Sequence, residues 1–225
     1  MTFSIAARCE KSGMFGMAVS SSSPAVAARC AFARAGVGAV SSQNITDPSL
    51  GERGLDLMQA GKTAQEALDE IVATADYIQY RQLTAVDMNG GTACFSGEKT
   101  LGINATFNAE NVACAGNLLS GTHIPKAMVQ AFQTSKGYLA DRLLIAMRAA
   151  VDTGGEEGPI HSAGMLLVDK VSWPVASLRI DWHEAADPIG ELEKLWKIYE
   201  PQLDAYVTRA LDPSDAPSYG VPGDE

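Results

Sequence analysis

The sequence predicts an α+β fold, a four-layer α-β-β-α sandwich of two mostly antiparallel sheets. Strand-like and helical patterns come in blocks, in the order strands, two helices, strands, two helices, strands, helix. Turn residues join neighbouring strand-like segments into hairpins, so their pairing is antiparallel. Hydrophobic residues make up 46% of the 225 residues, which is enough for a substantial core. Two sheets stacked face to face, with helices outside, accommodate this order of elements.

The first block of strands opens the chain. Residues 2–8 alternate between larger apolar side chains on one face and smaller side chains on the other. A turn at Ser12 and Gly13 leads to a second alternating segment, residues 15–19, so these two strands form a hairpin. A third strand is expected over residues 36–42, where the glycines allow another backbone or a ligand to approach closely.

Helical signals follow. Asp47 and Pro48 are typical of an N-cap and a first helical position, and Gly61 is typical of a helix end. Thr63 and Glu66 form the capping box of a second helix. An apolar stripe follows this box, so we expect both helices to cover one face of a sheet.

The rest of the chain repeats this alternation. An Asn89-Gly90 turn predicts a hairpin between residues 82–87 and 91–96, and a short strand follows over residues 112–115. The remaining predicted elements are helices opening at Pro125 and Leu139, a hairpin of residues 163–169 and 175–181, and a C-terminal helix that begins at Asp187 and kinks or restarts at Pro201.

We expect a single domain over residues 1–211 and a flexible C-terminal tail over residues 212–225. Proline, aspartate, serine and glycine dominate the tail, and such composition cannot build a packed core. Exposed sheet edges and the interrupted C-terminal helix favour a homodimer.

Composition disfavours several classes of partner. The net charge of −10 disfavours binding to nucleic acid and to anionic membranes, which carry charge of the same sign. No apolar run reaches the ~20 residues of a membrane helix, and no secretory leader pattern opens the chain. The four cysteines show no CxxC pairing and have small or apolar neighbours, as buried free thiols do. We therefore expect a cytoplasmic protein whose partner is a small molecule.

The commoner catalytic motifs are missing from the sequence. It contains no GxGxxG after a strand, no P-loop and no GxSxG elbow. Three histidines, His123, His161 and His183, lie too far apart in sequence for a zinc motif. We expect neither a metal nor a cofactor.

Thr2 is the candidate nucleophile. Methionine aminopeptidases generally accept a small second residue, so Met1 is removable. Thr2 would then carry both a hydroxyl and a free α-amine, whose ordinary pKa is about 7.7–8.0. One residue would thereby supply the nucleophile and the general base in a built-in orientation. Many cytosolic proteins begin Met-Thr for no catalytic reason, so this interpretation depends on the surrounding fold.

The chain resembles a known group of proteins. Residues 2–8 are similar to the N-terminal strand of the N-terminal nucleophile (Ntn) hydrolases. From residue 2 to about residue 200, the chain resembles the uncharacterised Ntn-like family catalogued as domain of unknown function 1028. The superfamily implies the α-β-β-α sandwich and amide-bond hydrolysis, and the family implies no known substrate. The matching stretches are residues 2–8, 16–21, 35–43, 54–57, 81–82, 116–119, 139–144, 154–158, 162–163 and 178–181, with Pro188.

Five further residues are candidates near the nucleophile. Gly116 and Asn117 follow a strand, where a backbone N–H and the Asn117 amide would form an oxyanion hole; the alternative is an ordinary strand-end turn. Ser20 and Ser21 end the second strand and would hydrogen-bond the α-amine or the substrate, or simply reflect strand polarity. Gln82 would bind polar groups of the substrate.

Asn44 and Arg81 are also candidate substrate-binding residues. Arg81 suits a carboxylate because its guanidinium bonds bidentately, although a structural salt bridge explains it equally well. Glu156 and Glu157 lie in a glycine-rich segment that we interpret as a solvated turn.

The leading hypothesis is an Ntn-type amidohydrolase acting on a small amide or peptide-like compound. The alternative is a non-catalytic binding or interaction module with the same fold. Two observations favour this alternative: residues 20–40 contain Arg29 and Arg34 but no lysine that could tune the nucleophile, and an attached Met1 would turn the Thr2 amine into a peptide nitrogen. A third, weaker hypothesis is a hydrolase using Ser120 with His123.

Overall fold

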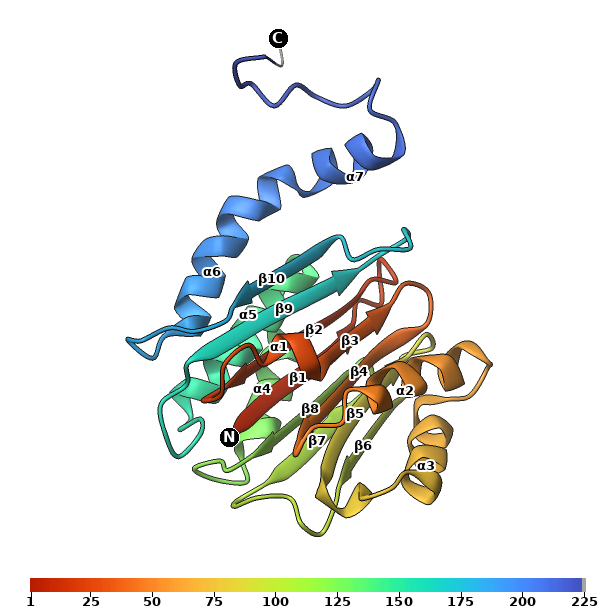
Figure 1. The fold of residues 1–225 in the computed structure, drawn as a ribbon, viewed down its shortest axis with the longest axis vertical. Coiled ribbons are helices and arrows are strands. Elements are labelled where there is room, and N and C mark those ends of the chain that lie inside the picture. The colour runs from red at the N-terminus through yellow and green to blue at the C-terminus, as the bar shows by residue number, and fades with distance from the viewer. Residues whose placement is uncertain (224–225) are drawn as a thin grey trace.

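A computed structural model of the chain describes residues 1–223, and its strands form two antiparallel sheets (Figure 1). The larger sheet contains, in spatial order, β10 (Ala176–Ile180), β9 (Ser162–Val168), β2 (Phe15–Ser21), β1 (Thr2–Arg8), β8 (Val112–Asn117) and β7 (Ala105–Ala109). The smaller sheet contains β3 (Ala31–Arg34), β4 (Gly38–Asn44), β5 (Arg81–Asp87) and β6 (Thr92–Ser96).

Buried apolar side chains join the layers. Phe15 and Met17 of the larger sheet pack against Ala39 and Val86 of the smaller one, which forms the core between the sheets. A second core lies between the larger sheet and helices α4 (Ile124–Thr134), α5 (Leu139–Asp152) and α6 (Pro188–Tyr199), and a third between the smaller sheet and helices α2 (Ser49–Gln59) and α3 (Ala64–Thr74). The predicted α+β fold with two antiparallel sheets is therefore confirmed, and helices pack on both sheets. The helices are α1 (Ala27–Cys30), α2 (Ser49–Gln59), α3 (Ala64–Thr74), η1 (Ile78–Tyr80), α4 (Ile124–Thr134), α5 (Leu139–Asp152), α6 (Pro188–Tyr199), η2 (Glu200–Gln202) and α7 (Leu203–Leu211).

Local signals place many of these elements where the sequence predicts them. β1 has the predicted bounds, and the Asn89-Gly90 turn joins β5 to β6. The capping box forms at α3, since the Thr63 hydroxyl accepts from the Glu66 backbone and the Glu66 carboxylate accepts from the Thr63 backbone. Pro201 lies in the short η2 helix that separates α6 from α7, so the chain restarts there.

Among the α-helices and strands, the sequence analysis does not predict α1, β3 and β7. β3 and β7 are edge strands of four and five residues with no fully buried side chain. Such strands lack the alternating burial that marks a strand in sequence. α1 has only four residues, which is too short for a helical stripe.

From α7 onward, the chain extends away from the two sheets (Figure 1). α7 ends at Leu211, and residues 212–223 contain neither helix nor strand. The predicted tail also includes residues 224–225, which lie outside the described residues. Within residues 1–223, none of the helices has the length and apolar character needed to cross a membrane.

Candidate active site

Thr2 begins the strand that lies between β2 and β8. It is opposite Ser21 on one side and opposite Asn117 on the other. Directly opposed residues of antiparallel strands point to the same face of the sheet. Ser4 shares this face, and its hydroxyl donates to Oε1 of Gln43 in the smaller sheet at 2.6 Å. Thr2, Ser21 and Asn117 therefore form one group on the face that looks toward the smaller sheet.

A buried network of side-chain amides, those of Gln43, Gln82 and Asn117, supports this group. Nδ2 of Asn117 donates to Oε1 of Gln82 at 3.2 Å, and Nε2 of Gln82 donates to the carbonyl of Gly116 at 3.0 Å. Nε2 of Gln43 also donates to Oε1 of Gln82, at 2.8 Å. Because buried amides require partners, this network fixes the position of the Asn117 side chain beside Thr2. Three candidates from the sequence, Gln82, Gly116 and Asn117, are thus brought together.

A chain of hydroxyls connects Thr2 to a cation. Oγ1 of Thr2 lies 3.3 Å from Oγ of Ser21, which lies 2.9 Å from Oγ of Ser23. Nη2 of Arg29 donates to Oγ of Ser23 at 2.6 Å. The sequence contains no lysine in this region, and the structure places Arg29 at the end of the hydroxyl chain instead. The sequence names Arg29 and Arg34 alike and could not tell which of them lies near Thr2, because Arg29 is linked to the site through two serines.

Met1 occupies the space in front of Thr2. Its carbonyl oxygen accepts a hydrogen bond from the Thr2 hydroxyl at 2.5 Å and another from the Ser21 hydroxyl. With Met1 attached, the Thr2 nitrogen is part of a peptide bond. Thr2 is only 6% exposed, so the site is closed in this form.

The segment formed by residues 156–161, here called the strap, crosses the end of β1. At one end, Glu156 bridges to Leu119, just beyond β8. At the other, the His161 N–H donates to the carbonyl of Ser21 in β2 at 2.9 Å. Because β1 lies between β2 and β8, the strap passes over Met1. A side chain at Gly158 would begin next to the Met1 thioether methyl, so Met1 packs on the strap.

Glu156 is the unexpected residue of the strap. The residue is 7% exposed, and among residues 1–223 neither carboxylate oxygen has a hydrogen-bond partner of normal geometry. Burial raises the pKa of Glu156 to about 8, while the Met1 α-ammonium and the Ser22 backbone act in the opposite direction. The interpretation of this segment as a solvated turn is correct for the exposed Glu157 and wrong for Glu156.

Ser20 does not join the group around Thr2. It lies opposite Phe3, whose side chain belongs to the core beneath the helices, so Ser20 points to the other face of the sheet. Its hydroxyl donates to the Ser162 carbonyl at 3.1 Å. Adjacent residues of a strand face opposite sides, so only Ser21 of this pair reaches the candidate site.

Asn44 and Arg81 lie at the ends of β4 and β5, away from this group. Asn44 has a φ of 74°, and its amide donates to the Tyr80 carbonyl at 2.6 Å, which is a structural role. The Arg81 guanidinium donates to the carbonyl of Ile45. Within residues 1–223, Arg81 forms no salt bridge.

The Ser120 hypothesis receives no support from geometry. The His123 ring bonds through Nε2 to the carbonyl of Thr153 at 2.9 Å, and among the described residues it makes no hydrogen bond to Ser120.

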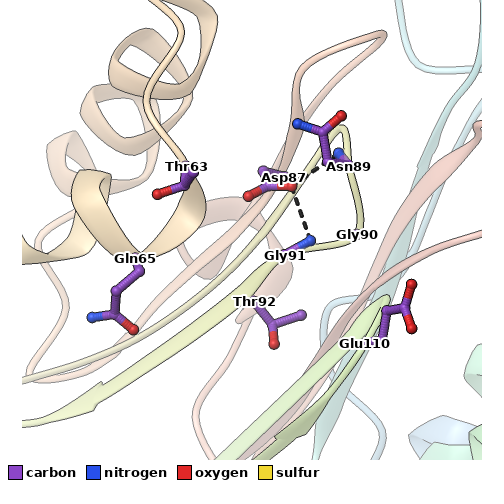
Figure 2. A pocket seen from close by; sticks show the side chains of 8 residues that line it. All are labelled: Thr63, Gln65, Asp87, Asn89, Gly90, Gly91, Thr92 and Glu110. Carbon is purple, nitrogen blue, oxygen red and sulfur yellow. Dashed lines mark hydrogen bonds between the residues drawn. The ribbon is translucent and has the colours of Figure 1, made fainter.

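A surface hollow of about 590 Å³ lies at the other end of β5 from Gln82 (Figure 2). The buried Asp87 carboxylate accepts from the backbone N–H groups of Ala64, Asn89 and Gly91, each at 2.9 Å. Asp87 therefore closes a turn and holds the start of α3, and it has no free oxygen directed at a ligand.

The unpartnered Glu156 carboxyl makes stability depend on pH. Its pKa is raised in the folded chain from the ordinary 4.5 to about 8. Between these values the unfolded chain is ionised while the folded chain keeps the proton, so stability falls as pH rises through this window. Glu156→Gln removes this titration. Relative to wild type, we expect the variant to gain on the order of 1–4 kcal/mol between about pH 5 and pH 8.

Urea unfolding at both pH values, on chains that retain Met1, measures this difference. The exposed neighbour provides the control, since Glu157→Gln should follow the wild-type curve. An unchanged pH dependence in Glu156→Gln would contradict the burial of an ionisable carboxyl.

The chain is similar to solved structures of two kinds. The crystal structure of protein SPO2555 from Silicibacter pomeroyi, described as DUF1028, is 30% identical, covers 88% of each chain and gives a TM-score of 0.82. Anbu (ancestral beta-subunit) from Yersinia bercovieri is 12% identical over 90% of this chain and 96% of its own, with a TM-score of 0.40. Anbu from Hyphomicrobium sp. strain MC1 is 10% identical over 90% and 97%, also with a TM-score of 0.40. The two Anbu similarities are too weak to support a functional argument.

The sequence profile of one family matches most of the chain. This profile, described as a family of unknown function (DUF1028), matches residues 2–192. No curated protein matches the chain. With the profile match and the similarity to SPO2555, the chain belongs to the DUF1028 family of unknown function.

Proposed function

We propose that the chain, once cleaved before Thr2, is an N-terminal nucleophile amidohydrolase acting on a small amide or peptide-like substrate. One observation carries this proposal. The Thr2 hydroxyl lies against a carbonyl, that of Met1, while Ser21 and Asn117 flank it on neighbouring strands. A nucleophile must be held in this way, close to an acyl group and beside polar groups that orient it.

The reaction follows from one residue with two functional groups. The neutral α-amine of Thr2 takes the hydroxyl proton as Oγ1 attacks the substrate carbonyl carbon. The protonated amine then gives this proton to the leaving nitrogen, the C–N bond breaks, and an ester to Thr2 remains. Water, deprotonated by the same amine, attacks the ester carbonyl. The ester bond to Oγ1 breaks, Oγ1 regains a proton, and the acid leaves.

Asn117 is the best-placed donor for the charge that develops on the carbonyl oxygen. It lies directly opposite Thr2, and one of its two amide hydrogens is used by Gln82. The other is left for a substrate oxygen. The Ser21 hydroxyl already donates to the Met1 carbonyl oxygen and is a second donor at the same position. Donors fixed before the reaction stabilise the transition state without reorganising.

A binding module without chemistry is the second candidate, favoured by how fully Met1 fills the site. With Met1 in place, Thr2 has no free amine and is 6% exposed. If the cell never removes Met1, the fold serves as a scaffold or a receptor. Whether the native protein begins at Met1 or at Thr2 distinguishes the two functions. Location in the cytoplasm and assembly as a homodimer remain predictions in both cases.

Replacing Thr2 tests the nucleophile. In chains that begin at residue 2, we expect Thr2→Ala to lower kcat/KM by about a thousandfold or more on any amide that wild type hydrolyses. Thr2→Ser keeps a hydroxyl and an amine, so it should stay within roughly tenfold to a hundredfold of wild type. Intact mass establishes the first residue of each preparation. Full activity of Thr2→Ala would rule out this nucleophile.

Replacing Arg29 tests the hydroxyl chain. A nearby cation lowers the pKa of an amine, so Arg29→Gln should move the acid limb of the kcat/KM profile to higher pH by roughly half a unit. Arg34→Gln is the matched control, because Arg34 pairs with Glu52 and Asp56 outside the site. Equal shifts in both variants would mean that the overall charge, and not the link through Ser23 and Ser21, controls the profile.

A further inference from the structure

We propose that a hollow at the end of β1 opposite to Thr2 binds a small molecule that carries two or more negative charges on phosphate or carboxylate groups. β1 begins at Thr2 and ends at Arg8, and an extended strand of this length spans about 20 Å. The hollow is therefore distinct from the candidate active site. The inference goes beyond the proposed function and does not depend on whether Thr2 is a nucleophile.

Three connections of the chain meet around this hollow, here called the basic hollow. Its volume is about 600 Å³, which is within the range of pockets that hold small organic ligands. It is lined by the turn between β1 and β2, the turn between β7 and β8, and the loop between α4 and α5. The backbone N–H of Arg8 donates to the carbonyl of Asn111 at 2.9 Å, and Nη1 of Arg8 donates to Oδ1 of Asn111 at 3.0 Å. These bonds join the two turns to each other.

Four cationic side chains line the basic hollow, in a chain whose net charge is −10. They are Arg8, Lys11, Lys136 and Arg142. Within residues 1–223, none of the four forms a salt bridge. Two exposed carboxylates, Glu10 and Glu110, also line the hollow, which leaves an excess of two positive charges. Cations that are gathered in one concave place without acidic partners attract a multivalent anion.

The guanidinium of Arg142 is held in place by the protein itself. Nη2 of Arg142 donates at 3.2 Å to the carbonyl of Phe132, near the C-terminal end of α4, and Cζ lies 4.0 Å from the centre of the Phe132 ring. Among the described residues, Nη1 of Arg142 and Nη2 of Arg8 have no hydrogen-bond partner. Because arginine binds phosphate and carboxylate groups through its fork of N–H donors, these free groups suit an oxyanion.

The distribution of charge favours a small molecule over a nucleic acid. Salt screens charges that lie more than about 8 Å apart at physiological ionic strength, so a small anion in the hollow meets mainly the local excess of positive charge. A long polyanion would also lie against the rest of a protein whose net charge is −10, and that charge would repel it.

Cys9 provides a reporter inside the basic hollow. Burial raises the pKa of the Cys9 thiol, but hydrogen bonds from Ser12 and from the Lys11 backbone, together with the charge of Arg142, outweigh this effect and hold the pKa below its usual 9.0. Since the thiolate is the reactive form, iodoacetamide should alkylate Cys9 before the other cysteines. Burial raises the pKa of those three thiols, which are Cys30, Cys94 and Cys114.

Calorimetric titration of the full chain with pyrophosphate, citrate and acetate, at equal ionic strength, tests the proposal. We expect pyrophosphate or citrate to bind at least about tenfold more tightly than acetate, because each places several charges among the cations. Tighter binding of pyrophosphate would support a ligand with phosphate groups, and tighter binding of citrate would support a polycarboxylate. Equal affinity for all three anions would overturn the proposal.

Two pairs of substitutions at exposed lysines locate the bound anion. Lys11→Gln combined with Lys136→Gln should weaken binding by at least about tenfold. The matched control, Lys126→Gln combined with Lys197→Gln, changes the net charge equally outside the hollow and should leave the affinity within about twofold. The bound anion should also slow the alkylation of Cys9, as measured by peptide mapping. Equal weakening by the two pairs, or binding that leaves the alkylation rate of Cys9 unchanged, would overturn the proposal.

Discussion

The register of β1 between β2 and β8 is the constraint on which the candidate site depends. It sets Thr2 opposite Ser21 and Asn117, on the face that looks toward the smaller sheet. A slip of one residue would turn Thr2 toward the helices and bring Phe3 into the polar layer between the sheets. The register is held because Phe3 and Ile5 pack in the core beneath the helices, while Ser4 bonds across to Gln43. Apolar packing on the helix-covered face of β1 therefore fixes the position of Thr2 on the opposite face.

The site combines two kinds of buried polar group. The amides of Gln43, Gln82 and Asn117 satisfy one another and make this end of the sandwich rigid. Glu156, in contrast, is buried and forms no ion pair within residues 1–223. Natural proteins seldom keep such a group unless a ligand or a reaction uses it, because its desolvation is uncompensated.

Much of this arrangement follows from local sequence patterns. Alternation predicts β1, and the turn at Ser12 and Gly13 predicts its hairpin with the second strand, so the proximity of Thr2 and Ser21 could be anticipated. Gln82 and Asn117 could be named as candidates, but their positions beside Thr2 depend on long-range pairing and packing. The same alternation, applied to the second strand, would have placed Ser20 on the wrong face for this site.

Residues whose role comes from distant contacts could not be found in this way. The glycines around Glu156 predict an exposed turn. Its burial arises only because the strap crosses the end of β1. Arg29 lies in α1, a four-residue helix that no sequence pattern predicts, and its link to Thr2 passes through Ser23 and Ser21. Both depend on segments brought together by the sheet order, which local periodicity does not contain.

Acylation of the N-terminal residue is the most direct test of the central claim, that Thr2 is a nucleophile activated by its own amine. A β-lactone, which opens by transferring its acyl group to a reactive hydroxyl, would be incubated with chains beginning at Met1 and at residue 2. Intact mass and peptide mapping would then locate the adduct. The account predicts one adduct on Thr2 in the chain that begins there and none in the chain that keeps Met1. Equal labelling of the two forms, or an adduct confined to another residue, would contradict it.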